Sequence, residues 1–159
     1  MRVPLASAVT LWAALTSAGP LAARERFQCS IETQAAAAIL DLRDRGQPKS
    51  FVLAPLPAQE PAFNDRKGSL QARLVVQMHS IIEDVYAYPD VETATYVAYR
   101  MATCTERNAG RKVPLAFSEV ALPMSGCQQK HGDQASAALT RCVDEALRYY
   151  QGKDATPPR

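Results

Sequence analysis

The residues whose type and spacing indicate the most definite chemistry in this 159-residue chain are its four cysteines, Cys29, Cys104, Cys127 and Cys142. An even number of cysteines in an exported chain is typical of disulfide bonding. A structural zinc site would need closely spaced pairs of cysteines, whereas the nearest two here are 15 residues apart. The spacing therefore predicts two disulfides.

Four cysteines permit three pairings, and sequence alone does not choose among them. We favour Cys29–Cys104 with Cys127–Cys142. Cys29 opens the first expected helix and Cys104 lies near the end of the third, so adjacent, parallel-displaced helices could bring them together. Cys127 just precedes the last expected helix, which contains Cys142. The other two pairings stay open.

His79 and Glu83 stand four residues apart in an expected helix, so they share one face. They could be metal ligands or an acid–base pair, with His131 or Asp84 as a third member, in a small periplasmic hydrolase or metal-dependent enzyme. No HExxH, serine-nucleophile or phosphate-loop motif accompanies them. An edge histidine with a glutamate one turn later is also ordinary surface chemistry. An enzyme is thus the less favoured interpretation, and we expect no catalytic residue, metal or cofactor.

Tyrosine is the most unevenly distributed residue. Tyr86, Tyr88, Tyr96 and Tyr99 are four of the six tyrosines and fall within fourteen residues. Protein interfaces are enriched in tyrosine, which makes these four the candidate partner-binding residues. The alternative is that Tyr96 and Tyr99 flank a buried helix face and cover the core with their hydroxyls in water.

Four segments carry the 3.6-residue period of an amphipathic helix, and no segment sustains a period of two. They are Gln28–Arg45, Asp65–Tyr86, Asp90–Arg107 and Asp133–Gln151. The pattern predicts an all-α fold of about four amphipathic helices in a compact bundle stapled by disulfides.

Two of these helices carry detailed expectations. In the first, the apolar stripe is read as Ile31, Ala35, Ala38/Ile39 and Leu42, with Gly46 as the left-handed stop. In the last, Asp133 is the expected N-cap. Arg141/Glu145 and Asp144/Arg148 are expected ion pairs one turn apart on its outer face.

Two stretches between the helices lack a clear period. Residues 47–64 contain four prolines, which disfavour a regular helix, so we expect a long Pro-rich loop between helices one and two that packs across the bundle. Within residues 111–132, the segment Ala116–Ala121 could form one or two helical turns.

Residues 1–23 have the features of a secretory signal peptide: Arg2, then an uncharged apolar run that ends in small residues before Arg24. Cleavage after Ala23 would leave a single helical domain, residues 24–152, and a disordered tail, residues 153–159. No other segment approaches the roughly 18 apolar residues of a membrane span. The expected location is therefore the periplasm or the cell exterior.

Without residues 1–23 the chain keeps 17 basic residues against 16 acidic ones, because only Arg2 is lost from the 18. This balance excludes nucleic-acid binding through a basic surface. In architecture the chain resembles small exported helical proteins of Gram-negative bacteria, such as periplasmic immunity proteins and enzyme inhibitors. The leading interpretation is a non-catalytic protein-binding module of inhibitor, immunity or assembly-factor type, whose partner is another exported protein.

Overall fold

A computed structural model describes residues 20–58 and 70–153. Within these ranges the chain forms six α-helices and one turn of 3-10 helix, with no strand, which confirms the all-α prediction. The elements in chain order are α1 (Pro20–Asp44), α2 (Lys49–Leu53), α3 (Leu70–Ala87), α4 (Thr93–Asn108), η2 (Phe117–Glu119), α5 (Ala121–His131) and α6 (Ala137–Lys153).

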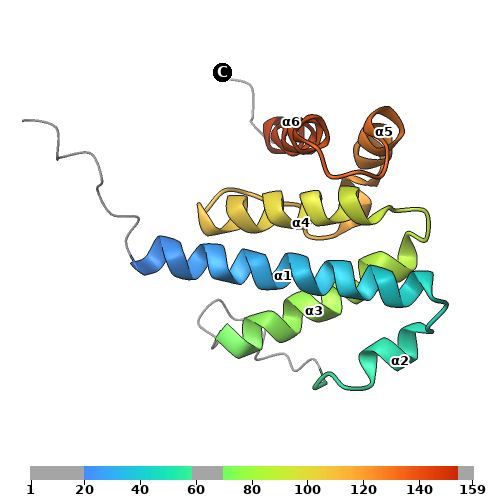
Figure 1. Cartoon of the computed structure of the whole chain (residues 1–159). Coiled ribbons are helices and arrows are strands. Elements are labelled where there is room, and N and C mark those ends of the chain that lie inside the picture. Colours follow the sequence, from blue (N-terminus) through green and yellow to red (C-terminus); the bar gives the residue numbers. More distant parts are fainter. Residues whose placement is uncertain (1–19, 59–69, 154–159) are drawn as a thin grey trace, which may run out of the picture.

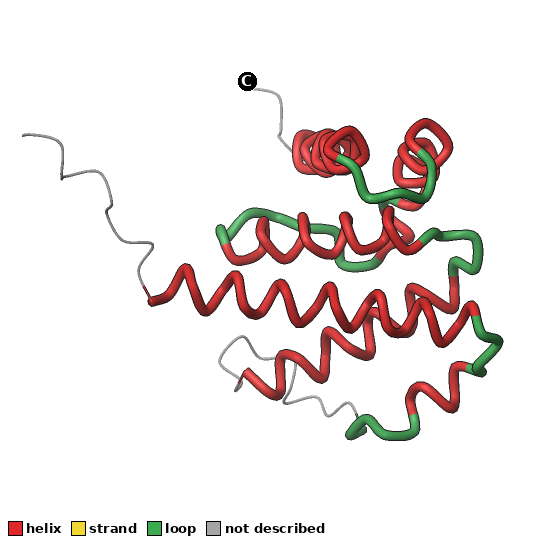
Figure 2. Tube along the Cα trace, viewed as in Figure 1, coloured by secondary structure: helices red, strands yellow, loops and turns green. Residues whose placement is uncertain are grey.

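Helix α1 lies at the centre of the bundle, between α3 on one side and α4 on the other (Figure 1). Helices α5 and α6 pack on the far side of α4 and run across it, so both are seen end-on in this view. Figure 2 shows α2 as a short separate helix beside α3. In the described part of the chain, no helix is long and apolar enough to span a membrane.

The buried face of α1 differs from the predicted stripe. Its buried side chains belong to Gln28, Cys29, Glu32, Thr33, Ala36, Ile39 and Leu40. This face keeps the helical period, but it includes Glu32. Because Glu32 is charged, a pattern of apolar residues does not contain it. The helix also begins earlier than expected, at Pro20. Its end agrees with the prediction, because Gly46 takes a left-handed φ of 78° just beyond it.

The Pro-rich segment is only partly described, since residues 59–64 lie outside the described ranges. Against the expectation of a continuous loop, Lys49–Leu53 forms the short helix α2. Pro48 precedes the helix and Pro55 follows it, so neither ring interrupts its hydrogen bonds. Val52 is the buried residue of α2.

Two predicted helix starts are wrong by a few residues. Helix α4 is preceded by Glu92 rather than Asp90. Helix α6 begins at Ala137, and the hydroxyl of Ser136 accepts a hydrogen bond of 3.1 Å from the backbone N–H of Leu139. Asp133 lies in the preceding loop. The sequence prediction started both helices too early, because several residues that can cap a helix stand close together before each of them.

Helix α5 was not predicted. It contains Pro123 and Gly126, two residues that normally argue against a helix. Pro123 is its third residue, where the missing N–H has no intrahelical partner to lose. Only Met124 and Cys127 are buried in it, which is too few to produce a visible period.

An aromatic cluster fills the core between α4 and the η2 turn. The ring of Phe117 makes edge-to-face contacts with Tyr88, Tyr96 and Tyr99, at centroid distances of 5.1, 5.3 and 5.0 Å. Such pairs add about 0.5–1.5 kcal/mol each beyond the area they bury. Phe117 therefore anchors the loop between α4 and α5 to the bundle.

The two disulfides are the pairs favoured from the sequence, which confirms that prediction. Cys29–Cys104 joins the first half of α1 to the end of α4, and these helices run antiparallel rather than parallel as expected (Figure 1). Cys127–Cys142 joins α5 to α6. Their Cα atoms are 5.5 and 5.7 Å apart. The first bond fixes α1 to α4, and the second holds α5 and α6 together on the other side of α4.

Candidate functional site

The four candidate tyrosines do not form one surface. Tyr96 and Tyr99 are 0% and 2% exposed, so they are core residues that a partner could not reach on the folded protein. The prediction that they bind a partner is corrected on this ground. The Tyr96 hydroxyl is not in water either, because it donates a 3.0 Å hydrogen bond to the buried Asp84. Burial raises the pKa of both tyrosines.

Tyr86 and Tyr88 are half-buried and serve the turn that joins α3 to α4. The Tyr86 hydroxyl donates a 2.6 Å hydrogen bond to the carbonyl of Gln47, just after α1. The ring of Tyr88 packs on Phe117. Both side chains therefore hold elements of the bundle together, and little of either is offered to a partner.

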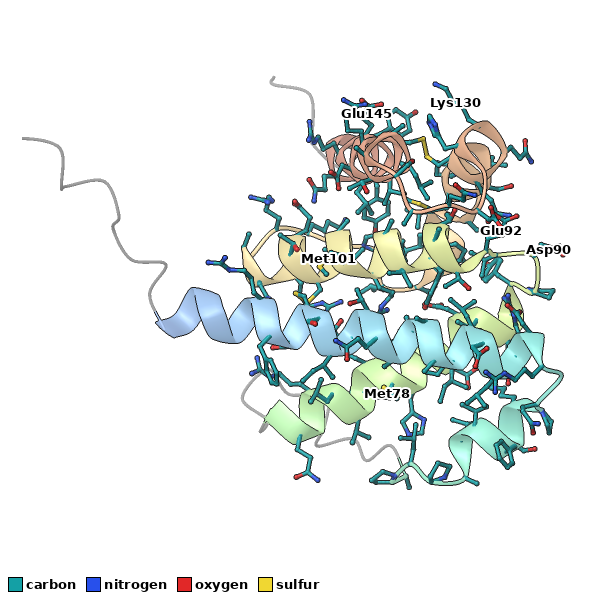
Figure 3. The ribbon with its side chains drawn as sticks, viewed as in Figure 1. Met78, Asp90, Glu92, Met101, Lys130 and Glu145 are labelled. Carbon is teal, nitrogen blue, oxygen red and sulfur yellow. A yellow bond between two sulfur atoms is a disulfide. The ribbon has the colours of Figure 1, made fainter. Side chains whose placement is uncertain are left out.

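A polar pocket of about 240 Å³ lies at the same corner of the bundle. The guanidinium of Arg43 donates to the carbonyls of Tyr88 and Val91, at 3.3 and 3.0 Å, so it links α1 to this turn. Asp90 and Glu92 also line the pocket (Figure 3). Within the described residues no three histidine, cysteine or acidic side chains are grouped to hold a metal ion.

His79 and Glu83 are each bonded to the segment around α2 rather than to one another. The Nε2 atom of His79 lies 2.9 Å from the carbonyl oxygen of Pro57. Glu83 forms an ion pair with Lys49 at 2.5 Å. These contacts attach α2 and the residues after it to α3. His131 belongs to α5, which packs on α4 and α6.

A buried charged cluster between α1, α3 and α4 was not foreseen from the sequence. Glu32 is 1% exposed and accepts hydrogen bonds from Arg107 at 3.2 and 3.3 Å and from Arg100 at 3.4 Å. Arg100 also donates to Gln77 at 2.7 Å. The two arginines supply hydrogen bonds and positive charge to the carboxylate of Glu32, which would otherwise be costly to bury. The signal was available in the spacing, because Glu32 lies one turn after Gln28 and one turn before Ala36.

A second buried carboxylate lies in the aromatic core. Asp84 accepts hydrogen bonds from the Tyr96 hydroxyl at 3.0 Å and from the backbone N–H of Phe117 at 3.2 Å. Burial raises the pKa of Asp84, while the two hydrogen bonds act in the opposite direction. This carboxylate fixes the η2 turn to α3 and α4, which is a structural role.

The surface feature best suited to binding is a groove of about 340 Å³ between α4 and α6. Its apolar lining comes from Ala98, Met101 and Ala102 of α4 and from Leu147 of α6. Met101 is 42% exposed, so part of this large apolar side chain is open to solvent at the groove. Figure 3 labels Met101 on α4 below α6. Small alanines on α4 leave the space that the crossing helix does not fill.

Charged side chains line the α6 edge of this groove. Asp144 and Arg148 stand one turn apart, with the buried Leu147 between them. The predicted ion pair between these two residues is not formed, and neither has an ion-pair partner elsewhere in residues 20–58 and 70–153. Two charges of opposite sign, neither of them in an ion pair, therefore border an apolar surface.

Glu106 on α4 also borders the groove, but its carboxylate is already occupied. It forms an ion pair with Arg111 and accepts a 3.0 Å hydrogen bond from the side chain of Gln151. The hydrogen bond from Arg111 holds the pKa of Glu106 below its usual range. The charge of Arg148 also lowers the pKa of Glu106, so Asp144 is the groove charge with no described partner, and Arg148 is a groove charge that forms no ion pair within the described residues.

Comparison with family models, with curated proteins and with solved structures found no match to this chain. The functional argument therefore depends on the geometry of the groove and on the sequence.

Proposed function

We propose that this protein is an exported, non-catalytic protein-binding module, of inhibitor, immunity or assembly-factor type, that works in a bacterial periplasm or outside the cell. The observation that carries the proposal is the α4–α6 groove, which exposes Met101 beside two charges that form no ion pair in the described parts of the chain. Exposed apolar surface with polar edges is a mark of protein interaction sites.

The export part of the proposal is supported by the two disulfides together with the sequence of residues 1–23. Disulfides persist in oxidising compartments and are rare in the cytosol of mesophiles. Every cysteine of the chain is paired in the structure. Cleavage after Ala23 would release a chain whose first cysteine, Cys29, lies six residues beyond the cut.

The groove is a rigid surface, which suits it to recognition of a partner. Both of its walls are fixed, since α4 is bonded to α1 through Cys104 and α6 is bonded to α5 through Cys142. A volume of about 340 Å³ lies near the lower end of the roughly 300–1,000 Å³ found for ligand pockets. It can receive a few side chains of a partner, the usual size of a binding hot spot. Pre-formed walls reduce the entropy lost on binding.

The test is to purify the mature protein gently, with a C-terminal tag, from the periplasm of the cell that produces it and to measure its native mass. A second protein in stoichiometric amount, absent from an unrelated exported protein with the same tag, is the expected result. A bare chain, four hydrogens lighter than its reduced sequence, at all expression levels would contradict the binding function.

A further inference from the structure

We propose that the α4–α6 groove binds a segment of a partner protein that presents an apolar side chain between a basic residue and an acidic one. The basic residue pairs with Asp144, the apolar side chain enters between Met101 and Leu147, and the acidic residue pairs with Arg148. This inference rests on the proposed binding function and specifies the chemistry of the partner.

The apolar part of the argument comes from the lining of the groove. Ala98 and Ala102 are half-buried and small, so a side chain can approach the backbone of α4 closely there. Met101 has a flexible, polarisable side chain that adapts to the shape of an apolar ligand. Leu147 closes the bottom at 3% exposure. A branched or aromatic side chain of a partner would cover all four.

The charges specify what flanks that side chain. Asp144 is half-buried beside the apolar lining and has no ion-pair or hydrogen-bond partner in the described parts of the chain. A cation brought against it would be shielded from water by the partner, which strengthens the pair. Arg148, one turn later on α6, is exposed and forms no ion pair with the described residues, and its charge lies within electrostatic range of Glu106. The carboxylate of Glu106 is bonded to Arg111 and Gln151, so it attracts Arg148 without forming an ion pair with it.

Two other occupants fit less well. If two copies of the chain met groove to groove, two concave surfaces would face each other and neither would fill the other. A second copy would have to offer a different surface. A fatty acid or similar amphiphile would match Arg148 and the apolar lining but would leave Asp144 with no counter-charge. A partner segment with both charges satisfies the whole groove.

The first experiment places a photo-reactive phenylalanine at Met101 in the full exported chain and, as the matched control, at Leu122 on α5. Leu122 is 86% exposed and does not line the groove. Irradiation in the producing cell should give one protein adduct from position 101 and none from position 122. Mass spectrometry of the adduct then identifies the partner and the segment that was cross-linked.

The second experiment reverses one charge. Asp144→Lys should weaken binding of that partner by about tenfold or more. Glu145→Lys, the adjacent acid on the outer side of α6 (Figure 3), should leave binding within about twofold. Replacing the partner's basic residue with glutamate should restore binding to Asp144→Lys. Thermal unfolding of both variants verifies that the bundle is intact.

The outcomes distinguish a failure of the proposed groove site from a failure of the proposed binding function. A partner that copurifies but cross-links only from position 122, or that tolerates Asp144→Lys, contradicts the groove and leaves the binding function standing. An adduct of twice the chain mass, or a bound amphiphile with no protein adduct, contradicts the partner chemistry. No copurifying protein and no adduct from either position contradicts both.

Discussion

The hydroxyl of Tyr96 lies 3.0 Å from the carboxylate of Asp84, and both side chains are buried. The tyrosine donates the hydrogen bond, and the backbone N–H of Phe117 donates a second one to the same carboxylate. The candidate binding tyrosine thus belongs to a polar contact inside the core. Its hydroxyl ties α4 to α3, and the backbone of Phe117 adds the η2 turn.

The first prediction concerns pH. Burial raises the pKa of Asp84 above its ordinary value of 3.8, so the folded chain keeps this proton over a range in which the unfolded chain has lost it. Asp84 therefore makes the free energy of unfolding fall as the pH rises from 3.8 through the folded pKa. Asp84→Asn removes this slope, so the stability of the variant relative to the parent should increase over that range.

Urea unfolding of both proteins at several pH values between 3.5 and about 8 measures this difference. The comparison with the parent is needed because Glu106 and Glu119 have lowered pKa values, and such carboxyls give a slope of the opposite sign. A difference between variant and parent that does not change with pH would show that the folded chain does not hold the proton at Asp84.

The second prediction concerns the buried tyrosines. Tyr99→Ala leaves a cavity beside Phe117 and should lower the free energy of unfolding by about 3–5 kcal/mol. Leu122→Ala, a truncation of an exposed apolar side chain, should change it by less than about 0.5 kcal/mol. Chemical denaturation measures both. Similar small effects in the two variants would place Tyr99 outside the core.

The third prediction concerns the buried carboxylate of α1. Glu32→Gln leaves Arg100, which is 3% exposed, without a counter-charge and should cost about 3–5 kcal/mol. Asp41→Asn on the same helix removes an exposed ion pair with Arg45 and should cost less than about 1 kcal/mol. If the two acids contribute equally, Glu32 is not the counter-ion of Arg100. Equilibrium unfolding in urea provides the comparison.

The fourth prediction ranks the disulfides. In the chain-entropy model, the 75-residue separation of Cys29–Cys104 is worth about 4.5 kcal/mol and the 15-residue separation of Cys127–Cys142 about 3 kcal/mol. Replacing each pair with alanines should therefore destabilise the protein in that order. Midpoints of thermal unfolding, compared with those of the fully reduced parent, test the ranking. The reverse order would mean that native contacts around α5 depend on the shorter bridge.

The sequence predicted the helical class and the long helices, because these depend on patterns that persist over many residues, whereas the disulfide pairing was a preference among three that the sequence left open. Helix α5 was missed because it buries only Met124 and Cys127 and contains Pro123. The face of α1 was misplaced because Glu32 occupies a core position. Its burial depends on Arg100 and Arg107, which are about seventy residues away in the chain.

The groove could not be foreseen in the same way. It exists because α6 crosses α4 over a pair of alanines, and a crossing depends on side chains from both helices. The tyrosines drew attention by their density, yet density along the chain does not distinguish an interface from an aromatic core. Met101 marks the groove by its exposure, which depends on how α6 crosses α4 and not on its spacing within α4.

The order of the disulfides along the chain has a consequence for how the protein acquires them. Cys29 is bonded to the next cysteine in the sequence, Cys104, and Cys127 to the next one after that, Cys142. A catalyst that oxidises cysteines as they emerge, amino terminus first, would meet each native pair consecutively. Such a chain reaches its final connectivity without any bond being reshuffled, so its maturation requires a thiol oxidant and no disulfide isomerase.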